Sequence, residues 1–233
     1  MAYKTELHCH TSEFSPCSNT SGRDVAEKYI EHGYTTVVVT NHFRKGSYGY
    51  NDHRELCRKF FEAADVMREA AGDRMNVLTG MEVSFEDMPN DFLVFGMTEE
   101  MAADMPDMFD MGIDRFHRAV ENKGVLVIQA HPFRFGQTVI NPGNVDGIEV
   151  FNGHPRWHSH NDVAKIWAAL WAEHYAVGKR FILTSGTDHH DNWHIPDGGI
   201  ETEEPITTNE ELISVLKSGD YLRITCSLGE YDY

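Results

Sequence analysis

The stretch "TTVVVTNH" (residues 35–42) decides the fold class, because it joins a buried β-strand to an abrupt polar end. Its β-branched run is typical of a strand that is covered on both faces, as in parallel sheets. Other strand-like runs also end in histidines or acids: "YKTELHCH" (3–10), "GVLVIQAH" (124–131) and "RFILTSGTDHH" (180–190). Periodicity predicts further strands over 76–85, 91–97, 146–152 and 221–225.

Helical periodicity separates these strands. Helices are predicted over 22–33, 52–72, 112–123, 161–178 and 208–219. Ser21 is a candidate N-cap, and Gly33 and Gly72 are candidate helix ends. Since strands and helices alternate without a long linker, we expect one α/β domain over residues 1–233. A barrel slightly smaller than the eightfold one fits this length.

The composition narrows the classes of partner. The formal net charge is −17, which repels phosphate backbones, so we expect no extended nucleic-acid binding. The four cysteines form no CxxC pair and indicate reduced thiols. No apolar run reaches membrane-spanning length, and we expect a cytoplasmic protein with no membrane partner. The sequence does not predict an oligomeric state.

Histidines and acids gather where the predicted strands end. In an α/β barrel these ends meet at one mouth, so residues far apart in the sequence would lie together. Residues two apart in a strand point to the same side, which lets His8 and His10 bind one ion. Imidazole and carboxylate ligands suit zinc, manganese or iron. The candidate metal ligands are His8, His10, His42, Glu82, His131, Asp188 and His190.

Five segments, taken in order, resemble the PHP family, named for polymerase and histidinol phosphatase. They are "ELHCHT", "TNH", "GMEVS", "AHPFR" and "GTDHH". The resemblance implies a distorted seven-stranded (β/α) barrel and a cleft with two or three divalent metal ions. It implies that His8, His10, Glu82 and Asp188 bind one ion, that Glu82 bridges to a second ion with His131, and that His42 and His190 bind a third.

The sequence departs from the family pattern at three places. Leu93 stands near the position of an expected histidine ligand, and Asp91 is a candidate substitute. The segment "SEFSPCS" offers Glu13, Ser15 or Cys17 where the third site often takes an acid or histidine. Asn41 replaces the usual aspartate of the second motif, so two ions are the safer expectation.

The resemblance implies a phosphoesterase that acts on a small phosphorylated metabolite through water activated by the metal. Glu82 and Asp188 are the candidate catalytic residues. Arg134, directly after the HP motif, and His154 are candidate substrate-binding residues, because guanidinium matches phosphate oxygens and imidazole can protonate a leaving group. Glu149 and Asn152 are candidates to orient ligands.

Two alternatives stay open. Amidohydrolase barrels, which split C–N bonds, also begin with an HxH strand. They commonly carry a lysine that bridges the metal ions, and no lysine ends a strand in a suitable place here. A non-catalytic metal-binding PHP module is the second alternative.

Overall fold

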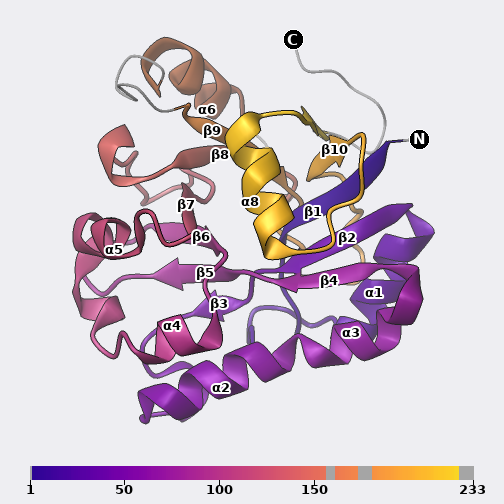
Figure 1. The fold of residues 1–233 in the computed structure, drawn as a ribbon, viewed down its shortest axis with the longest axis horizontal. Coiled ribbons are helices and arrows are strands. Elements are labelled where there is room, and N and C mark those ends of the chain that lie inside the picture. Colours follow the sequence, from indigo (N-terminus) through magenta and orange to yellow (C-terminus); the bar gives the residue numbers. More distant parts are fainter. Residues whose placement is uncertain (1, 156–160, 173–179, 226–233) are drawn as a thin grey trace.

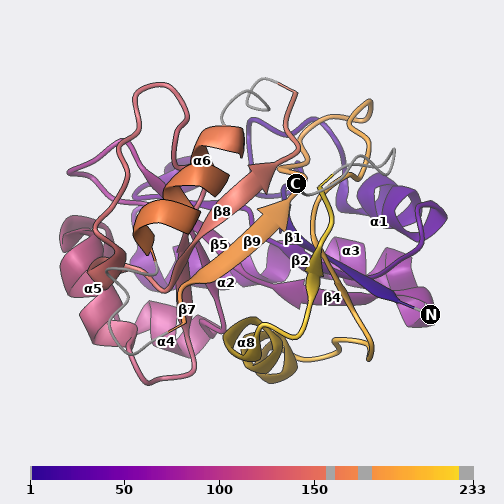
Figure 2. The same ribbon diagram turned by 90° about the horizontal axis from the view of Figure 1, so that it is seen from above.

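The computed structural model describes residues 2–155, 161–172 and 180–225, with strands surrounded by helices (Figures 1 and 2). The strands form two hydrogen-bonded sheets, with the orders β11-β10-β1-β2-β4 and β3-β5-β6-β7-β8-β9. The first contains β1 (Tyr3–Cys9), β2 (Tyr34–Val39), β4 (Asn76–Thr79), β10 (Ile200–Thr202) and β11 (Leu222–Arg223). The second contains β3 (His42–Phe43), β5 (Met81–Ser84), β6 (Asp91–Phe95), β7 (Leu126–Gln129), β8 (Gly147–Asn152) and β9 (Ile182–Gly186).

Two chain segments cross from one sheet to the other. Residues 40–41 separate β2 from β3, and Gly80 separates β4 from β5, while both pairs stay parallel across the break. Counting each broken segment once, seven strands run from β1 to β9. Cys9 at the end of β1 bridges to His189 after β9, and the His10 amide donates to the His189 carbonyl at 3.0 Å. The α/β prediction is confirmed, and these breaks divide the ladder into two sheets rather than one continuous barrel.

Strand β6 is the exception to parallel pairing in the second sheet, as β10 is in the first, where it pairs antiparallel with β1 and β11. Strand β6 runs antiparallel to both β5 and β7. Only a short connection, residues 85–90, joins β5 to β6, and a parallel neighbour would need a longer crossover. The sheet is therefore mixed at this point.

The helices begin and end at local signals. Side chains of Ser21, Asp52 and Thr208 cap the amides of the first turns of α1, α2 and α8. The predicted helix 52–72 is broken at Ala64, and the described part of 161–178 is α6 followed by a π-helical turn over Ala168–Ala172. Residues 173–178 of that prediction lie outside the described residues. The helices are α1 (Gly22–Glu31), α2 (His53–Ala63), α3 (Asp65–Ala71), α4 (Glu99–Ala103), α5 (Gly112–Val120), α6 (Asn161–Trp167) and α8 (Asn209–Ser218).

The interior of the ring is apolar. Leu212 and Leu216 of α8 pack in one buried cluster with Leu7 of β1 and Leu93 of β6. Because these strand residues point inward and α8 covers them, polar side chains concentrate beyond the carboxyl ends of the strands. In the part of the chain that the structure describes, no helix combines the length and apolar character needed to cross a membrane.

Candidate metal centre

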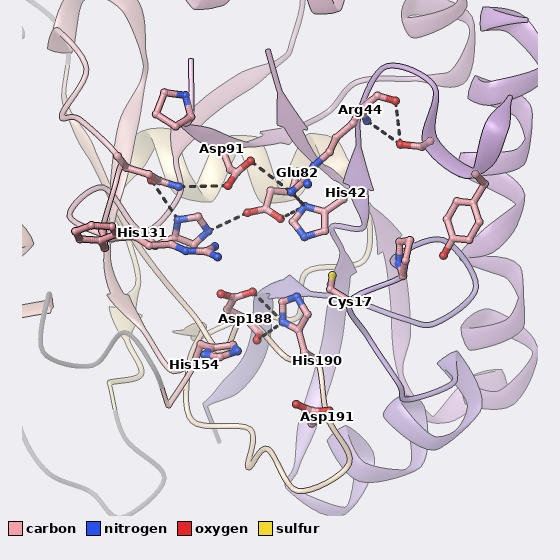
Figure 3. A pocket seen from close by; sticks show the side chains of 17 residues that line it. Cys17, His42, Arg44, Glu82, Asp91, His131, His154, Asp188, His190 and Asp191 are labelled. Atoms are coloured by element: carbon pink, nitrogen blue, oxygen red, sulfur yellow. Dashed lines mark hydrogen bonds and ion pairs between the residues drawn. The ribbon is translucent and has the colours of Figure 1, made fainter. Parts of the chain in front are cut away.

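The seven predicted ligands meet at one end of the ring. Figure 3 shows Glu82 of β5 between His131 and His42. Its Oε1 is 3.0 Å from His131 Nε2 and 3.5 Å from His8 Nε2. Its Oε2 is 2.6 Å from His42 Nδ1 and 3.4 Å from His10 Nε2. One carboxylate thus faces four imidazoles from three different segments of the chain.

Asp188 is the second carboxylate of this cluster. Its Oδ1 is 3.3 Å from His8 Nε2, from His10 Nε2 and from His190 Nδ1. Four overlapping groups of three donors lie within 4.8 Å of one another and could each hold a cation. They are His8–His10–Asp188, His8–Glu82–His131, His42–Glu82–Asp91 and His10–His42–His190.

The hydrogen bonding of the two strand histidines fits a cation. His8 and His10 are fully buried, and the Nε2 atom of each has no hydrogen-bond partner. Buried polar atoms are almost always paired, so these two nitrogens need a partner of another kind. Nδ1 of His8 lies 2.9 Å from Glu149 Oε1, and Nδ1 of His10 lies 3.2 Å from Ser15 Oγ. A proton held on Nδ1 leaves the Nε2 lone pair free for a metal.

Glu149 of β8 holds two of these segments together. It is buried, and its Oε2 accepts hydrogen bonds from the His131 amide and from Asn152 Nδ2, both at 2.9 Å. Asn152 Nδ2 also lies 3.3 Å from Asp188 Oδ2. Glu149 and Asn152 thus contact His8, His131 and Asp188 from behind, and their role in orienting ligands stays a prediction.

Charge in the cluster is balanced between acids and imidazoles. Burial raises the pKa of Glu82, but His42 and His8 outweigh burial and hold that pKa well below its usual value. Burial lowers the pKa of His42, but Glu82 outweighs it and raises the pKa to about 10. For His10, burial and the neighbouring His190 and His42 rings keep the pKa well below its usual value. His10 is therefore neutral, the form that binds a cation, while a divalent ion would take the place of protons on the other rings.

Two candidate ligands have unusual backbone conformations. His131 and Asp188 have φ angles of +27° and +53°, in the left-handed region that non-glycine residues rarely adopt. Such strain persists where the surrounding structure enforces it, and it is common at functional sites. Each lies two residues after the end of a strand, His131 after β7 and Asp188 after β9.

Strand β6 carries both residues that were considered for the ligand position after the glutamate motif, Asp91 and Leu93. Asp91 of β6 lines the cavity with His42 and Glu82, whereas Leu93 is fully buried in the apolar interior. Asp91 accepts hydrogen bonds from Ser84 Oγ at 2.5 Å and from Gln137 Nε2 at 3.2 Å. Asp91 is therefore the available donor on this strand.

The loop after His10 offers one donor to the cavity. Both carboxylate oxygens of Glu13 accept the Gly22 amide at 3.0 Å, which holds Glu13 at the start of α1. Ser15 Oγ donates to Asn41 Oδ1 at 2.9 Å and accepts the His42 amide at 3.0 Å, so Ser15 and Asn41 support the loop. Cys17 alone of the three candidates lines the cavity.

The Cys17 thiol interacts with two histidine rings of the cluster. Burial raises its pKa, but hydrogen bonds with His190 and His42 outweigh burial and lower the pKa to about 6. The thiol therefore carries thiolate character at neutral pH.

A cavity of about 550 Å³ opens beside the cluster (Figure 3), and the candidate substrate-binding residues Arg134 and His154 line it. Arg44 also lines it, and the sequence analysis did not identify this residue. Its Nη2 lies 3.0 Å from His42 Nδ1 and 3.8 Å from Asp91 Oδ1. The signal was its position two residues after His42, just beyond the end of β3. Residues 156–160 of the histidine-rich segment 153–160 lie outside the described residues.

Solved structures share this fold at low sequence identity. PsfC from Pseudomonas syringae matches with a TM-score of 0.63 and 18% identity over 91% of this chain and 88% of its own. The lesion-specific endonuclease PfuEndoQ from Pyrococcus furiosus matches with a TM-score of 0.61 and 12% identity over 96% of this chain and 58% of its own. An amidohydrolase from Chromobacterium violaceum was solved with bound sulfate and no metal. It matches with a TM-score of 0.53 and 14% identity over 94% of this chain and 98% of its own. None of the curated proteins matches the chain significantly.

These structures differ in the activity that their names state, so the shared fold does not decide the reaction. The family does follow from the sequence, because the model of the PHP domain matches residues 6–177, about three quarters of the chain. This match includes the HxH strand, Glu82 and the HP motif, which the structure brings into one cluster. The chain belongs to the PHP domain family.

Proposed function

We propose that this protein is a metal-dependent phosphoesterase that acts on a small phosphorylated metabolite. The observation that carries the proposal is the juxtaposition of a centre of nitrogen and oxygen donors with two arginines, Arg44 and Arg134, in the wall of one cavity. In the proposal, His8, His10, Glu82 and Asp188 would hold one ion, and Glu82 and His131 would hold a second.

The residues of the chain divide the chemical work. Divalent cations bound at this centre supply the activation of water and offset the negative charge that develops on the phosphoryl oxygens. Arg134 and Arg44 orient the phosphoryl group, because the guanidinium fork matches two of its oxygens. His154 is placed at the cavity wall to give a proton to the leaving oxygen. Glu82 and Asp188 set the position of the reacting centre.

The cavity favours phosphoester over amide substrates. Its wall carries two guanidinium groups, and among the cavity-lining residues that the structure describes there is no lysine. The named activity of the endonuclease, cleavage at nucleic-acid lesions, supports phosphoester chemistry on this fold. The net charge of −17 favours a small substrate over a long nucleic acid. The amidohydrolase with the same fold keeps C–N hydrolysis as the alternative to test.

The test begins with the metal content of the purified protein. Hydrolysis is then screened with Mn, Zn and Fe, using nucleotides, sugar phosphates, amino-acid phosphates and a matched set of N-acyl amino acids. Glu82→Gln should lower kcat/KM at least about a hundredfold by removing the shared carboxylate. Glu69→Gln, an acid-to-amide change at an exposed position of α3, is the control and should keep full activity. Turnover of the amides alone, or none by the metal-loaded protein, would reject the proposal.

A further inference from the structure

Gln137 contacts two candidate ligands of the metal centre from the loop after the HP motif. Its Oε1 lies 3.3 Å from His131 Nδ1, and its Nε2 donates to Asp91 Oδ2 at 3.2 Å. His131 and Asp91 belong to two different groups of donors, which share Glu82, and both lie beside Glu82 in Figure 3. One amide side chain in the cavity wall thus connects the two groups.

The orientation of this amide follows from its partners. A carboxylate accepts hydrogen bonds, so the Asp91 oxygen must face the NH₂ group of Gln137. The amide oxygen is then turned toward His131, where it can only accept, and the ring proton must lie on Nδ1. This tautomer leaves the lone pair on Nε2, the atom that lies 3.0 Å from the shared carboxylate of Glu82. Metal-binding histidines are commonly fixed in this way by a partner at the other ring nitrogen.

Buried amides hold the loop that carries Gln137. The Thr138 carbonyl accepts hydrogen bonds from Gln129 Nε2 at 2.7 Å and from Asn90 Nδ2 at 2.5 Å. Gln129 Oε1 also accepts the Ile140 amide at 2.9 Å, and both Gln129 and Asn90 are fully buried. These contacts fix the backbone next to Gln137, which lowers the entropy cost of holding its side chain between two partners.

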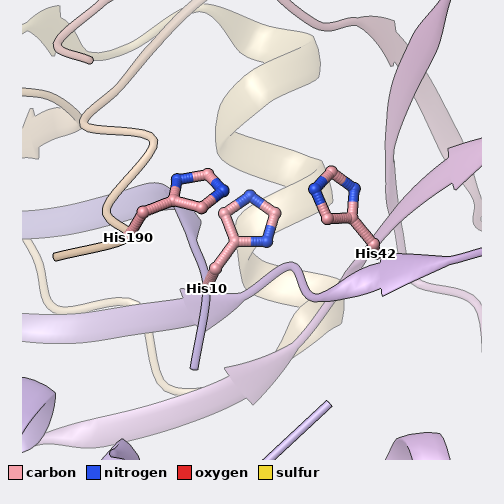
Figure 4. Close-up of side chains that lie close together, drawn as sticks. All are labelled: His10, His42 and His190. Carbon is pink, nitrogen blue, oxygen red and sulfur yellow. The ribbon is translucent and has the colours of Figure 1, made fainter. Parts of the chain in front are cut away.

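The imidazoles of His10, His42 and His190 form a separate part of the cluster (Figure 4). The centroid of the His10 ring is 4.6 Å from that of His42 and 4.2 Å from that of His190. His10 and His42 contact Oε2 of Glu82, whereas His131 contacts Oε1. A change confined to the His131 ring should therefore leave these three rings in place.

We propose that Gln137 is a positioning residue of the metal centre: it fixes the His131 ring by accepting from Nδ1–H and aligns the Asp91 carboxylate by donating to it. The inference rests on the proposed metal centre and does not depend on the identity of the substrate. The competing explanation is a residue that only closes the loop. That explanation predicts no change at the His131 ring or in metal affinity when an apolar side chain of the same length replaces Gln137.

Binding of Zn²⁺ to the metal-free full chain is the first readout. Gln137→Met keeps the length of the side chain and removes both hydrogen bonds, and it should weaken one bound Zn²⁺ at least about tenfold in competition with a chelator. The urea midpoint of the metal-free protein should not change, because Gln137 is only half-buried. Asn144→Leu is the matched control, since it replaces a half-buried amide outside the cavity wall, and it should keep the zinc affinity.

NMR spectra of the Zn²⁺-loaded protein with ¹⁵N-labelled histidines are the second readout. The Nδ1 proton of His131 should be protected from exchange with water in the wild type, and its signal should be lost in Gln137→Met. Gln137→Glu keeps an acceptor oxygen and should keep the signal. The Nδ1 proton of His8, which lies 2.9 Å from Glu149 Oε1, is the internal control and should persist in all three proteins.

A His131 signal that persists in Gln137→Met, or zinc binding by this variant within about threefold of the wild type, would overturn the assignment. Neither readout uses a substrate. The expected readouts without phosphoester turnover therefore reject only the proposed function, and turnover with unchanged readouts in Gln137→Met rejects only the role of Gln137.

Discussion

Replacement of Glu149 by glutamine tests whether the centre depends on a carboxylate behind the candidate ligands. This buried side chain receives three donors: His8 Nδ1, the His131 amide and Asn152 Nδ2, each at 2.9 Å. Glutamine keeps the volume but offers only one acceptor oxygen, so its NH₂ group must face at least one of these donors. The His8 ring then loses the partner that fixes its proton on Nδ1.

The expected loss follows from the role of such groups in metal proteins. Removing the partner of a metal-binding histidine typically weakens metal affinity roughly 10–100-fold. At about 1.4 kcal/mol for each factor of ten, this corresponds to about 1.4–2.8 kcal/mol of binding free energy. The assay is competition for Zn²⁺ against a chelator of known affinity at fixed pH, with folding checked by circular dichroism and urea unfolding of the metal-free protein.

A second carboxylate–histidine pair supplies the matched control. Asp146 accepts the Val127 amide at 2.9 Å and lies 3.3 Å from His117 Nε2, and none of these residues lines the cavity. Asp146→Asn should lower stability without changing the zinc affinity. The reasoning is refuted if folded Glu149→Gln binds Zn²⁺ within threefold of the wild type, or if Asp146→Asn weakens binding equally.

Three further changes test the packing, the electrostatics and the capping. Gly186→Ala would place a Cβ against His8 Cβ, closer than van der Waals contact permits, and should cost roughly 1–3 kcal/mol in urea unfolding and reduce bound metal. Burial and Glu6 raise the pKa of Asp197 to about 7, so this group stabilises the fold at low pH and loses that contribution as pH rises through about 7. The expected effect is reduced because this group is partly exposed. From pH 4 to pH 8, the unfolding free energy of Asp197→Asn should rise by roughly 1–2 kcal/mol relative to that of the wild type. A difference between the two proteins that does not change with pH would contradict this. Thr208→Ala removes one half of the capping box of α8 and should cost roughly 1 kcal/mol in thermal unfolding, whereas an unchanged Tm would show that the cap contributes nothing.

Most of the cluster could be predicted from the sequence because its members have local signals. A β-branched run followed by a histidine or acid identifies both the strand and its polar end at His42, His131 and Asp188, whereas His8 and Glu82 lie within β1 and β5. The helix caps at Ser21 and Thr208 are equally local, since the capping side chain and the capped amide are three residues apart.

The tertiary structure decided the features that depend on contacts between distant segments. Glu149 is 141 residues from its partner His8, and no local pattern connects them. The division into two sheets depends on how strand pairs cross at residues 40–41 and at Gly80, which the separate strand signals do not contain. Of the three neighbouring loop residues, Cys17 lines the cavity while Glu13 and Ser15 form hydrogen bonds elsewhere, and these contacts join distant segments. Sequence patterns specify which residues end a strand, but the packing of the ring decides which of them share a cation, because that depends on distances across the fold.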